Sequence, residues 1–330
     1  MSCWGVNSNG ALGDGLSASR ENPALVAGSG GWRTVTAGDG FTCAIHDADG
    51  HLYCWGRDDT GAGGNGWQGA SLVPSDIGYG LGWNQVDAGQ LHACAISAQS
   101  YLYCWGWAAY GQIGDNQTTT NRDQPALVTG LPEWQQVSAG GRHSCAIKTE
   151  DGSLWCWGDD STGQLGRGIP GSPWPTPYRV GSDGGWTTVS AGTQHTCAIR
   201  GARLYCWGDN SAGQLAADVV GASGTPLEVA GGAVCTAVAA GRALTCALRD
   251  DGSLWCWGDA EWGQVGDGGA AARSEPVPVA AGTAFQWLAA GPDHTCAATA
   301  EGTLSCWGKN SGGQLAIAAW AVKPAPISEP

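Results

Sequence analysis

The tripeptide Cys-Trp-Gly recurs along the whole chain at nearly constant spacing. Its copies begin at Cys3, Cys54, Cys104, Cys156, Cys206, Cys256 and Cys306. A fixed period of roughly 20–50 residues is typical of repeat architectures, in which each unit buries its apolar surface against its neighbours. We therefore interpret residues 1–330 as one domain whose repeats begin near residues 3, 54, 104, 156, 206, 256 and 306.

Each repeat predicts four short strands, which we label A to D. In residues 186–215, Trp-x-x-Val-x-Ala-Gly predicts strand A, Thr-Cys-Ala-Ile strand B and Leu-Tyr-Cys-Trp-Gly strand C, before a glycine-rich loop. A later Pro-x-x-Val segment, such as residues 125–128, predicts strand D at a sheet edge, where proline is tolerated. Asp-Gly pairs at residues 151–152 and 251–252 favour tight turns between B and C. Four antiparallel strands in every repeat are typical of a β-propeller blade.

The number of blades follows from the complete units. Such units begin at Trp32, Trp83, Trp134, Trp186, Cys235 and Trp287, and the aromatic residue there is expected to be a core residue of strand A. Residues 3–28 supply strands C and D of a further unit, whose A and B are not supplied after Leu315. We expect an all-β propeller, seven-bladed with an incomplete closing blade. A six-bladed ring with a surplus half-blade is the alternative.

Side-chain alternation explains why the repeat keeps these residues. Thr196 and Ala198 of strand B point to the same side as Tyr205 and Trp207 of strand C, because successive side chains of a strand alternate between faces. The small side chains leave room for the large ones. The tryptophan of each Cys-Trp-Gly is therefore predicted to be buried scaffold.

Twelve of the fourteen cysteines fall on strands B and C in pairs. The pairs are Cys43/Cys54, Cys94/Cys104, Cys145/Cys156, Cys197/Cys206, Cys246/Cys256 and Cys296/Cys306. Opposite residues on antiparallel strands have Cα atoms about 4.5–5.5 Å apart, a distance that a disulfide accepts. We expect six disulfides and hence an oxidising compartment, extracellular or periplasmic. Cys3 and Cys235 are left over, and no His/Asp arrangement marks either as a nucleophile.

Two other interpretations of the cysteines stay open. His195, Cys197 and Cys206 could ligate a metal, and the histidine recurs at His92, His143 and His294. Against this, no Cys-x-x-Cys spacing exists, and Phe41 and Leu244 replace the histidine in two units. Buried reduced cysteines that fill the blade core are the other interpretation.

Composition and motifs disfavour several function classes. With 15 basic and 29 acidic residues the net charge is −14, which argues against a nucleic-acid partner because phosphate binding needs clustered Lys and Arg. The sequence contains no run of about eighteen apolar residues, so we do not predict insertion into a membrane. Met1 and Ser2 lead directly into the first repeat and leave no room for a signal peptide, so we expect either a cytosolic protein or one whose signal peptide is absent from this sequence. No nucleotide-binding fingerprint is present, and we expect neither catalysis nor a cofactor.

Residues that could bind a partner lie between strands C and D. Tryptophans outside the repeated positions, with one tyrosine, gather there: Trp67, Trp107, Tyr110, Trp174, Trp262 and Trp320. Exposed Trp and Tyr are common anchors of protein interfaces. Carboxylates in the same segments could steer a basic partner, namely Asp58, Asp59, Asp159, Asp160, Asp259 and Glu261. Alternatively, the aromatic residues cover the blade ends and the carboxylates are merely solvated. The Asp-rich loops could also hold Ca²⁺, but the sequence has no EF-hand spacing.

With these residues in view, the chain resembles the regulator-of-chromosome-condensation repeat family. The resemblance rests on Ala191-Gly192 with His195, on Trp207-Gly208 and on the Gly-Gln-Leu of residues 213–215, and it covers about residues 3–315. It implies a propeller and hardly more, because one fold hosts many functions. The cysteine pair in each blade is similar to secreted bacterial members.

The resemblance implies three known functions to weigh. Nucleotide exchange on a small GTPase, with chromatin binding, is disfavoured by the charge and by the absence of a long insertion. Ultraviolet-B perception uses a Gly-Trp-Arg-His-Thr element, which here reads Gly-Gly-Arg-His at residues 140–143. Secreted bacterial members include a β-lactamase inhibitor that binds through loop residues.

The function that remains is a secreted or cell-surface propeller, a non-catalytic binding or scaffold module that engages a protein partner through one loop face. An intracellular exchange-like regulator is one alternative. A carbohydrate-binding propeller is the other, since exposed tryptophan also stacks on sugars. The sequence does not define the oligomeric state.

Overall fold

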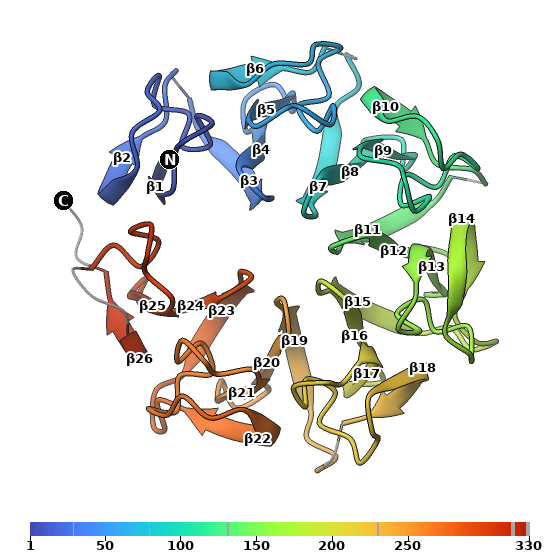
Figure 1. The fold of residues 1–330 in the computed structure, drawn as a ribbon, viewed down its shortest axis with the longest axis vertical. Coiled ribbons are helices and arrows are strands. Elements are labelled where there is room, and N and C mark those ends of the chain that lie inside the picture. Colours follow the sequence, from blue (N-terminus) through green and yellow to red (C-terminus); the bar gives the residue numbers. More distant parts are fainter. Residues whose placement is uncertain (29, 79, 131, 230, 318–320, 328–330) are drawn as a thin grey trace. The chain divides into compact units, whose positions relative to one another are not determined.

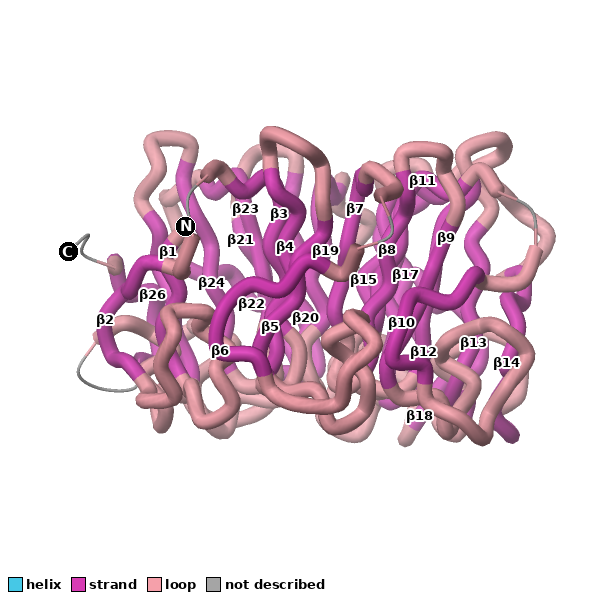
Figure 2. Tube along the Cα trace, turned by 90° about the horizontal axis from the view of Figure 1, so that it is seen from above, coloured by secondary structure: helices cyan, strands magenta, loops and turns pink. Residues whose placement is uncertain are grey.

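A computed structural model describes residues 1–330 except 29, 79, 131, 230, 318–320 and 328–330. The described secondary structure consists of β-strands joined by turns and loops (Figure 2). Accordingly, the described part of the chain holds no helix that could cross a membrane. The chain divides into two compact units, residues 1–159 with 172–184 and residues 160–171 with 185–330. The single-domain interpretation stays a prediction.

The first unit contains a two-stranded sheet and three four-stranded sheets (Figure 1). The pair is β1 (Ser2–Gly5) with β2 (Arg20–Leu25), followed by β3 (Trp32–Ala37), β4 (Phe41–His46), β5 (Leu52–Gly56) and β6 (Ser71–Asp76); β7 (Trp83–Ala88), β8 (His92–Ser97), β9 (Leu102–Gly106) and β10 (Arg122–Leu127); and β11 (Trp134–Ala139), β12 (His143–Lys148), β13 (Leu154–Asp160) and β14 (Gly171–Arg179). Strands neighbouring in sequence are neighbours in each sheet.

The second unit contains three four-stranded sheets with the same strand order. They are β15 (Trp186–Ala191), β16 (His195–Arg200), β17 (Arg203–Asp209) and β18 (Ala222–Glu228); β19 (Cys235–Ala240), β20 (Leu244–Arg249), β21 (Leu254–Gly258) and β22 (Arg273–Val279); and β23 (Phe285–Ala290), β24 (His294–Thr299), β25 (Leu304–Gly308) and β26 (Ala321–Pro326). The predicted A-to-D order of strands is confirmed in all six complete units.

The β1–β2 pair corresponds to the strands C and D that were predicted without their A and B. It pairs Ser2 with Leu25 and Cys3 with Ala24. The described residues thus form six complete blades and one half-blade. The number of blades in a closed ring stays a prediction.

The strand register confirms the predicted packing of small against large side chains. Thr196 lies opposite Trp207 and Ala198 opposite Tyr205. The strand C tryptophans are at most 1% exposed in the six complete blades: Trp55, Trp105, Trp157, Trp207, Trp257 and Trp307. These residues are scaffold, as expected.

Successive blades are joined by a loop carbonyl that accepts two hydrogen bonds. The Gln112 carbonyl of one blade accepts from Trp157 Nε1 and from Ser144 Oγ of the next, both at 2.9 Å. In the second unit the Gln214 carbonyl accepts from Trp257 Nε1 and Thr245 Oγ1, both at 2.8 Å. The large indole therefore fills the core and also satisfies a buried polar group, which explains why tryptophan is repeated here.

The Ala-Gly-x-x-His element is a close-packing device. A Cβ on Gly192 would lie 2.5 Å from both the Gly241 carbonyl oxygen and His195 Cε1. No side chain fits there, because the imidazole and the neighbouring blade already occupy the space. His195 then places its Nε2 3.0 Å from Thr245 Oγ1 of the next blade.

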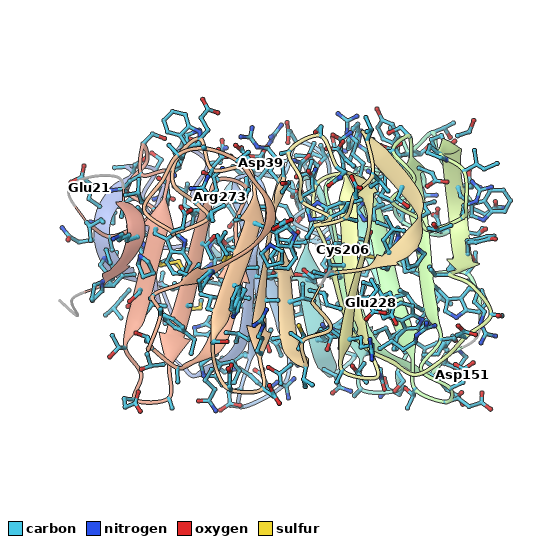
Figure 3. All side chains as sticks on the ribbon, turned by 90° about the horizontal axis from the view of Figure 1, so that it is seen from below. Glu21, Asp39, Asp151, Cys206, Glu228 and Arg273 are labelled. Carbon is cyan, nitrogen blue, oxygen red and sulfur yellow. A yellow bond between two sulfur atoms is a disulfide. The ribbon has the colours of Figure 1, made fainter. Side chains whose placement is uncertain are left out.

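All six predicted disulfides are present. Their Cα atoms are 4.0 to 4.1 Å apart, and each joins directly opposite residues of strands B and C; Cys206 of one bridge is labelled in Figure 3. Cys3 and Cys235 are free. Cys197 and Cys206, which lie directly opposite each other, are joined by one of these bridges. Neither thiolate is therefore left to bind a metal, and the pair is not reduced.

One core assignment was wrong. Phe285, and not Trp287, is the core aromatic residue of strand A in the last unit. Phe285 pairs with Thr299, the register that Trp186 has with Arg200. Phe285 is 6% exposed and Trp287 is 66% exposed. Phe285 lies three residues before Leu288 of the Leu-x-Ala-Gly element, as Trp186 lies three residues before Val189. Trp287 lies two residues beyond this position.

Candidate functional site

The two ends of the strands carry different connections. The A–B and C–D connections leave from one end of each blade, which we call the loop face, and the B–C turns lie at the other end. In the first unit, Asp39 of an A–B connection and Asp151 of a B–C turn lie at opposite ends of the strands (Figure 3). The C–D loops that hold Trp67, Trp107, Tyr110 and Trp262 therefore belong to the loop face.

The structure brings two predicted anchors together with an arginine. Trp107 directly follows β9, and Tyr110 lies in the next turn with its ring centroid 5.3 Å from that of Trp107. Arg142, the residue before β12, places its guanidinium carbon 4.9 Å from the Tyr110 ring centroid and 5.7 Å from that of Trp107. Arg142 Nη1 also donates to Tyr110 Oη at 3.0 Å. We call these three partly exposed residues the Arg142 cluster.

Trp262 lies beside a charged network in the second unit. Lys309 Nζ is 5.1 Å from the Trp262 ring centroid and 3.1 Å from an Asp293 carboxylate oxygen. Arg242 Nη2 is 2.7 Å from the other Asp293 oxygen and 3.8 Å from an Asp259 oxygen. Each of these charged residues directly follows strand C or just precedes strand B, as Trp107 and Arg142 do in the Arg142 cluster.

The remaining aromatic candidates do not join these groups. Trp67 is exposed in the loop between β5 and β6. Trp174 is exposed but lies within β14, where its ring centroid is 6.2 Å from that of Tyr178. Trp320 lies outside the described residues.

Sequence reasoning missed several residues of the loop face. Arg142, Arg242 and Lys309 were overlooked because their aromatic and acidic partners are distant in sequence. Exposed aliphatic side chains also occupy the C–D loops, at Leu16 in the first unit and at Ile169 and Val220 in the second. Their signal was an isolated large apolar residue within a Gly- and Asp-rich segment.

The predicted acidic rim is smaller than expected, because Asp58, Asp159 and Asp160 are buried. Asp58 accepts a hydrogen bond from the Gly63 amide at 2.7 Å, and Asp160 accepts one from the Leu165 amide at 3.1 Å. They shape the C–D loops from within. Burial raises the pKa of Asp58 to about 6. The carboxylates that reach the surface are Asp59, Asp259 and Glu261.

The repeated histidines are structural. His92 Nε2 lies 2.9 Å from Ser144 Oγ, and His195 Nε2 contacts Thr245 in the same way. Burial lowers the pKa of both His92 and His195 to about 4, so both rings are neutral at physiological pH. In the described part of the chain, no three His, Cys, Asp or Glu side chains gather in a way that could hold a metal ion.

The fold defines the class of this protein as an all-β propeller of four-stranded blades. Human WBSCR16 superimposes with a TM-score of 0.88 at 20% identity, over 100% of this chain and 94% of that one. Prp20p of Saccharomyces cerevisiae superimposes with a TM-score of 0.86 at 22% identity, over 99% and 85% of the two chains. Likeness at such identities shows the fold.

The sequence places the chain within this class. The regulator of chromosome condensation (RCC1) repeat matches residues 3–45, 100–147, 151–199 and 251–298, and a second profile of it matches residues 32–62, 83–112, 134–164, 186–214, 235–264 and 288–314. The chain belongs to the RCC1 repeat family. The ultraviolet-B receptor UVR8 of Arabidopsis thaliana is 33% identical over 202 residues, 59% of this chain and 46% of the receptor. The chain spans less than half the length of such curated relatives.

Proposed function

We propose that this protein is a secreted or cell-surface, non-catalytic propeller that binds a protein partner through its loop face. The observation that carries the proposal is the Arg142 cluster. Its stacked arginine, tryptophan and tyrosine are the residue types that dominate binding hot spots. Stacking of Arg142 on both rings holds them in place before binding, which lowers the entropy lost on association.

The disulfides support the compartment. Six bridges within the blades, buried except at the partly exposed Cys296, suit an oxidising environment, since cytosolic thiols are normally kept reduced. The net charge of −14 favours encounter with a basic partner by electrostatic steering.

Relatives support protein binding by this fold. Yeast Prp20 is described as binding Gsp1p and histones, and it has been crystallised with Kap60. A propeller of this fold can therefore present a protein-binding surface.

The test is affinity capture from the exported proteins of the source organism. Trp107→Ala and Trp262→Ala should each weaken capture of the partner while leaving the thermal midpoint nearly unchanged, because both side chains are partly exposed. Tyr101→Ala is the matched control, since Tyr101 is an exposed aromatic residue in a B–C turn at the opposite end of β9. Equal capture by all variants, or equal loss with Tyr101→Ala, would contradict the proposal.

A groove in the first unit favours carbohydrate binding as a second candidate function. It has a volume of about 460 Å³, and Trp134, Trp155, Glu150 and Asp151 contribute to its lining. The partly exposed indole of Trp155 can stack on a sugar ring, and the neighbouring carboxylates can accept hydrogen bonds from its hydroxyls, whereas Trp134 is buried beneath Lys148, whose Nζ is 4.0 Å from its ring centroid. Binding of soluble oligosaccharides that is lost in Trp155→Ala and retained in Trp107→Ala would support this candidate, and no binding would remove it.

A further inference from the structure

The half-blade has an unpaired strand edge. In all six complete blades strand C pairs with D on one edge and with B on the other, and the two cysteines of B and C form a disulfide. Strand β1 holds the same position with Cys3, but it pairs only with β2 in the part of the chain that the structure describes. Its other edge lies where strand B would pair, and Cys3 is free.

The sheet that follows the half-blade has an uncovered apolar face. Val35 of β3 is 51% exposed, whereas the equivalent valines are 3%, 1% and 9% exposed at Val86, Val137 and Val238. Val86 is buried in a cluster with Cys43 and Ile45 of the preceding strand B. Val238 is likewise clustered with the strand B residues Cys197 and Ile199. Strand B of the preceding blade is therefore what covers this valine elsewhere.

We propose that the free edge of β1 and the face around Val35 bind a β-hairpin of the repeat's own A–B type, whose cysteine forms a disulfide with Cys3. The occupant is defined by the other blades: an aromatic-x-x-Val first strand and a Thr-Cys-Ala-Ile second strand. The second strand extends the β1–β2 sheet by backbone hydrogen bonds, a recognised mode of peptide binding. This site lies apart from the Arg142 cluster and stands or falls independently of the proposed function.

The covalent step is an ordinary thiol oxidation. The Cys3 thiol and the hairpin thiol each lose a proton and an electron, and one S–S bond forms between them. Glutathione disulfide accepts the two electrons and two protons and leaves as two molecules of glutathione. Pairing across the strands raises the local concentration of one thiol near the other, so docking drives the bond.

A synthetic peptide of residues 186–202 is a suitable probe, because it carries both strand patterns and a single cysteine, Cys197. The full chain and the peptide are equilibrated in a glutathione redox buffer, and the products are mapped by mass spectrometry. We expect the mixed disulfide at Cys3 to form about tenfold more than with a scrambled peptide that retains the cysteine. Val35→Asp should remove this excess.

A peptide with serine in place of its cysteine gives a second, non-covalent readout. It should raise the thermal midpoint of the wild-type chain and leave that of Val35→Asp unchanged. The proposal is overturned by equal reaction of both cysteine peptides, by addition at Cys235, or by no shift in the midpoint. Preferential formation of Cys3–Cys3 dimers would also overturn it, because the occupant would then be a second copy of the chain.

Discussion

The buried hydroxyl of Thr245 connects two blades, and its removal tests this connection. Thr245 Oγ1 donates to the Gln214 carbonyl at 2.8 Å and lies 3.0 Å from His195 Nε2. A hydroxyl has one proton, so the proton in the second contact belongs to the imidazole, and His195 donates its Nε2–H to Thr245. Thr245→Val keeps the shape and removes both interactions.

The expected loss can be estimated from the two contacts. The Gln214 carbonyl keeps its hydrogen bond from Trp257 Nε1 at 2.8 Å, so the missing hydroxyl donor costs about 1 kcal/mol. The fully buried His195 retains an Nε2–H with no acceptor, which costs a further 1–3 kcal/mol or so. Thr245→Val should therefore lower the free energy of unfolding by about 2–4 kcal/mol.

The next blade provides a matched control. Thr295 Oγ1 donates to the Gln264 carbonyl at 3.0 Å, which also accepts from Trp307 Nε1. The residue equivalent to His195 in the preceding blade is Leu244, so no imidazole depends on this hydroxyl. Thr295→Val should lose only about 1 kcal/mol.

Urea unfolding at neutral pH, followed by tryptophan fluorescence with the disulfides intact, measures both losses. The same experiment on His195→Leu with Thr245→Val should show partial recovery relative to Thr245→Val alone, because leucine has no side-chain N–H to be left without an acceptor. Equal losses for Thr245→Val and Thr295→Val would refute the reasoning. So would the absence of any coupling between His195 and Thr245.

Three further predictions concern buried groups. His92 and His195 have pKa values lowered to about 4 in the folded chain, so the unfolded chain binds more protons between about pH 6.5 and 4. Each histidine should therefore lower the free energy of unfolding by about 2 kcal/mol when the pH falls from 7 to about 5, as measured by urea titrations. Asp58→Asn should raise the free energy of unfolding by about 2–3 kcal/mol at neutral pH, with a smaller gain below about pH 6, since the raised pKa marks a destabilised carboxylate; a loss would contradict this. Replacing both Cys197 and Cys206 with Ala opens a bridge of sequence separation 9 and should cost about 2.6 kcal/mol by the loop-entropy relation, whereas a loss near zero would show that the bridge constrains nothing.

The fold was predictable because every repeat applies the same local rules. Period-2 alternation fixed which residues share a face, and the opposition of Thr196 to Trp207 followed from it. The same register put Cys197 opposite Cys206, so the disulfides followed from strand pairing. The error at Trp287 arose where residue type was preferred over spacing, and the register of Phe285 corrects it.

The candidate site was only partly predictable, because it depends on contacts between consecutive repeats. Arg142 lies one repeat after Trp107 and Tyr110, and no local sequence pattern indicates that its guanidinium stacks on both rings. Asp58 belongs to a Gly- and Asp-rich loop that reads as solvated, yet its carboxylate turns inward to the Gly63 amide. Burial of a loop side chain depends on how the loop closes, which composition does not reveal.

The most direct test of the account is to count the free thiols of the denatured protein. The protein is purified without reductant from its native source or by oxidative expression, unfolded, labelled with a thiol reagent and weighed as an intact chain; prior reduction gives the fourteen-label reference. Two labels, at Cys3 and Cys235, are predicted for the chain with no hairpin bound at Cys3, and they would support a disulfide within each complete blade and an oxidising compartment. Fourteen labels without reduction would contradict the account, because no blade would then contain a disulfide and the case for secretion would be lost.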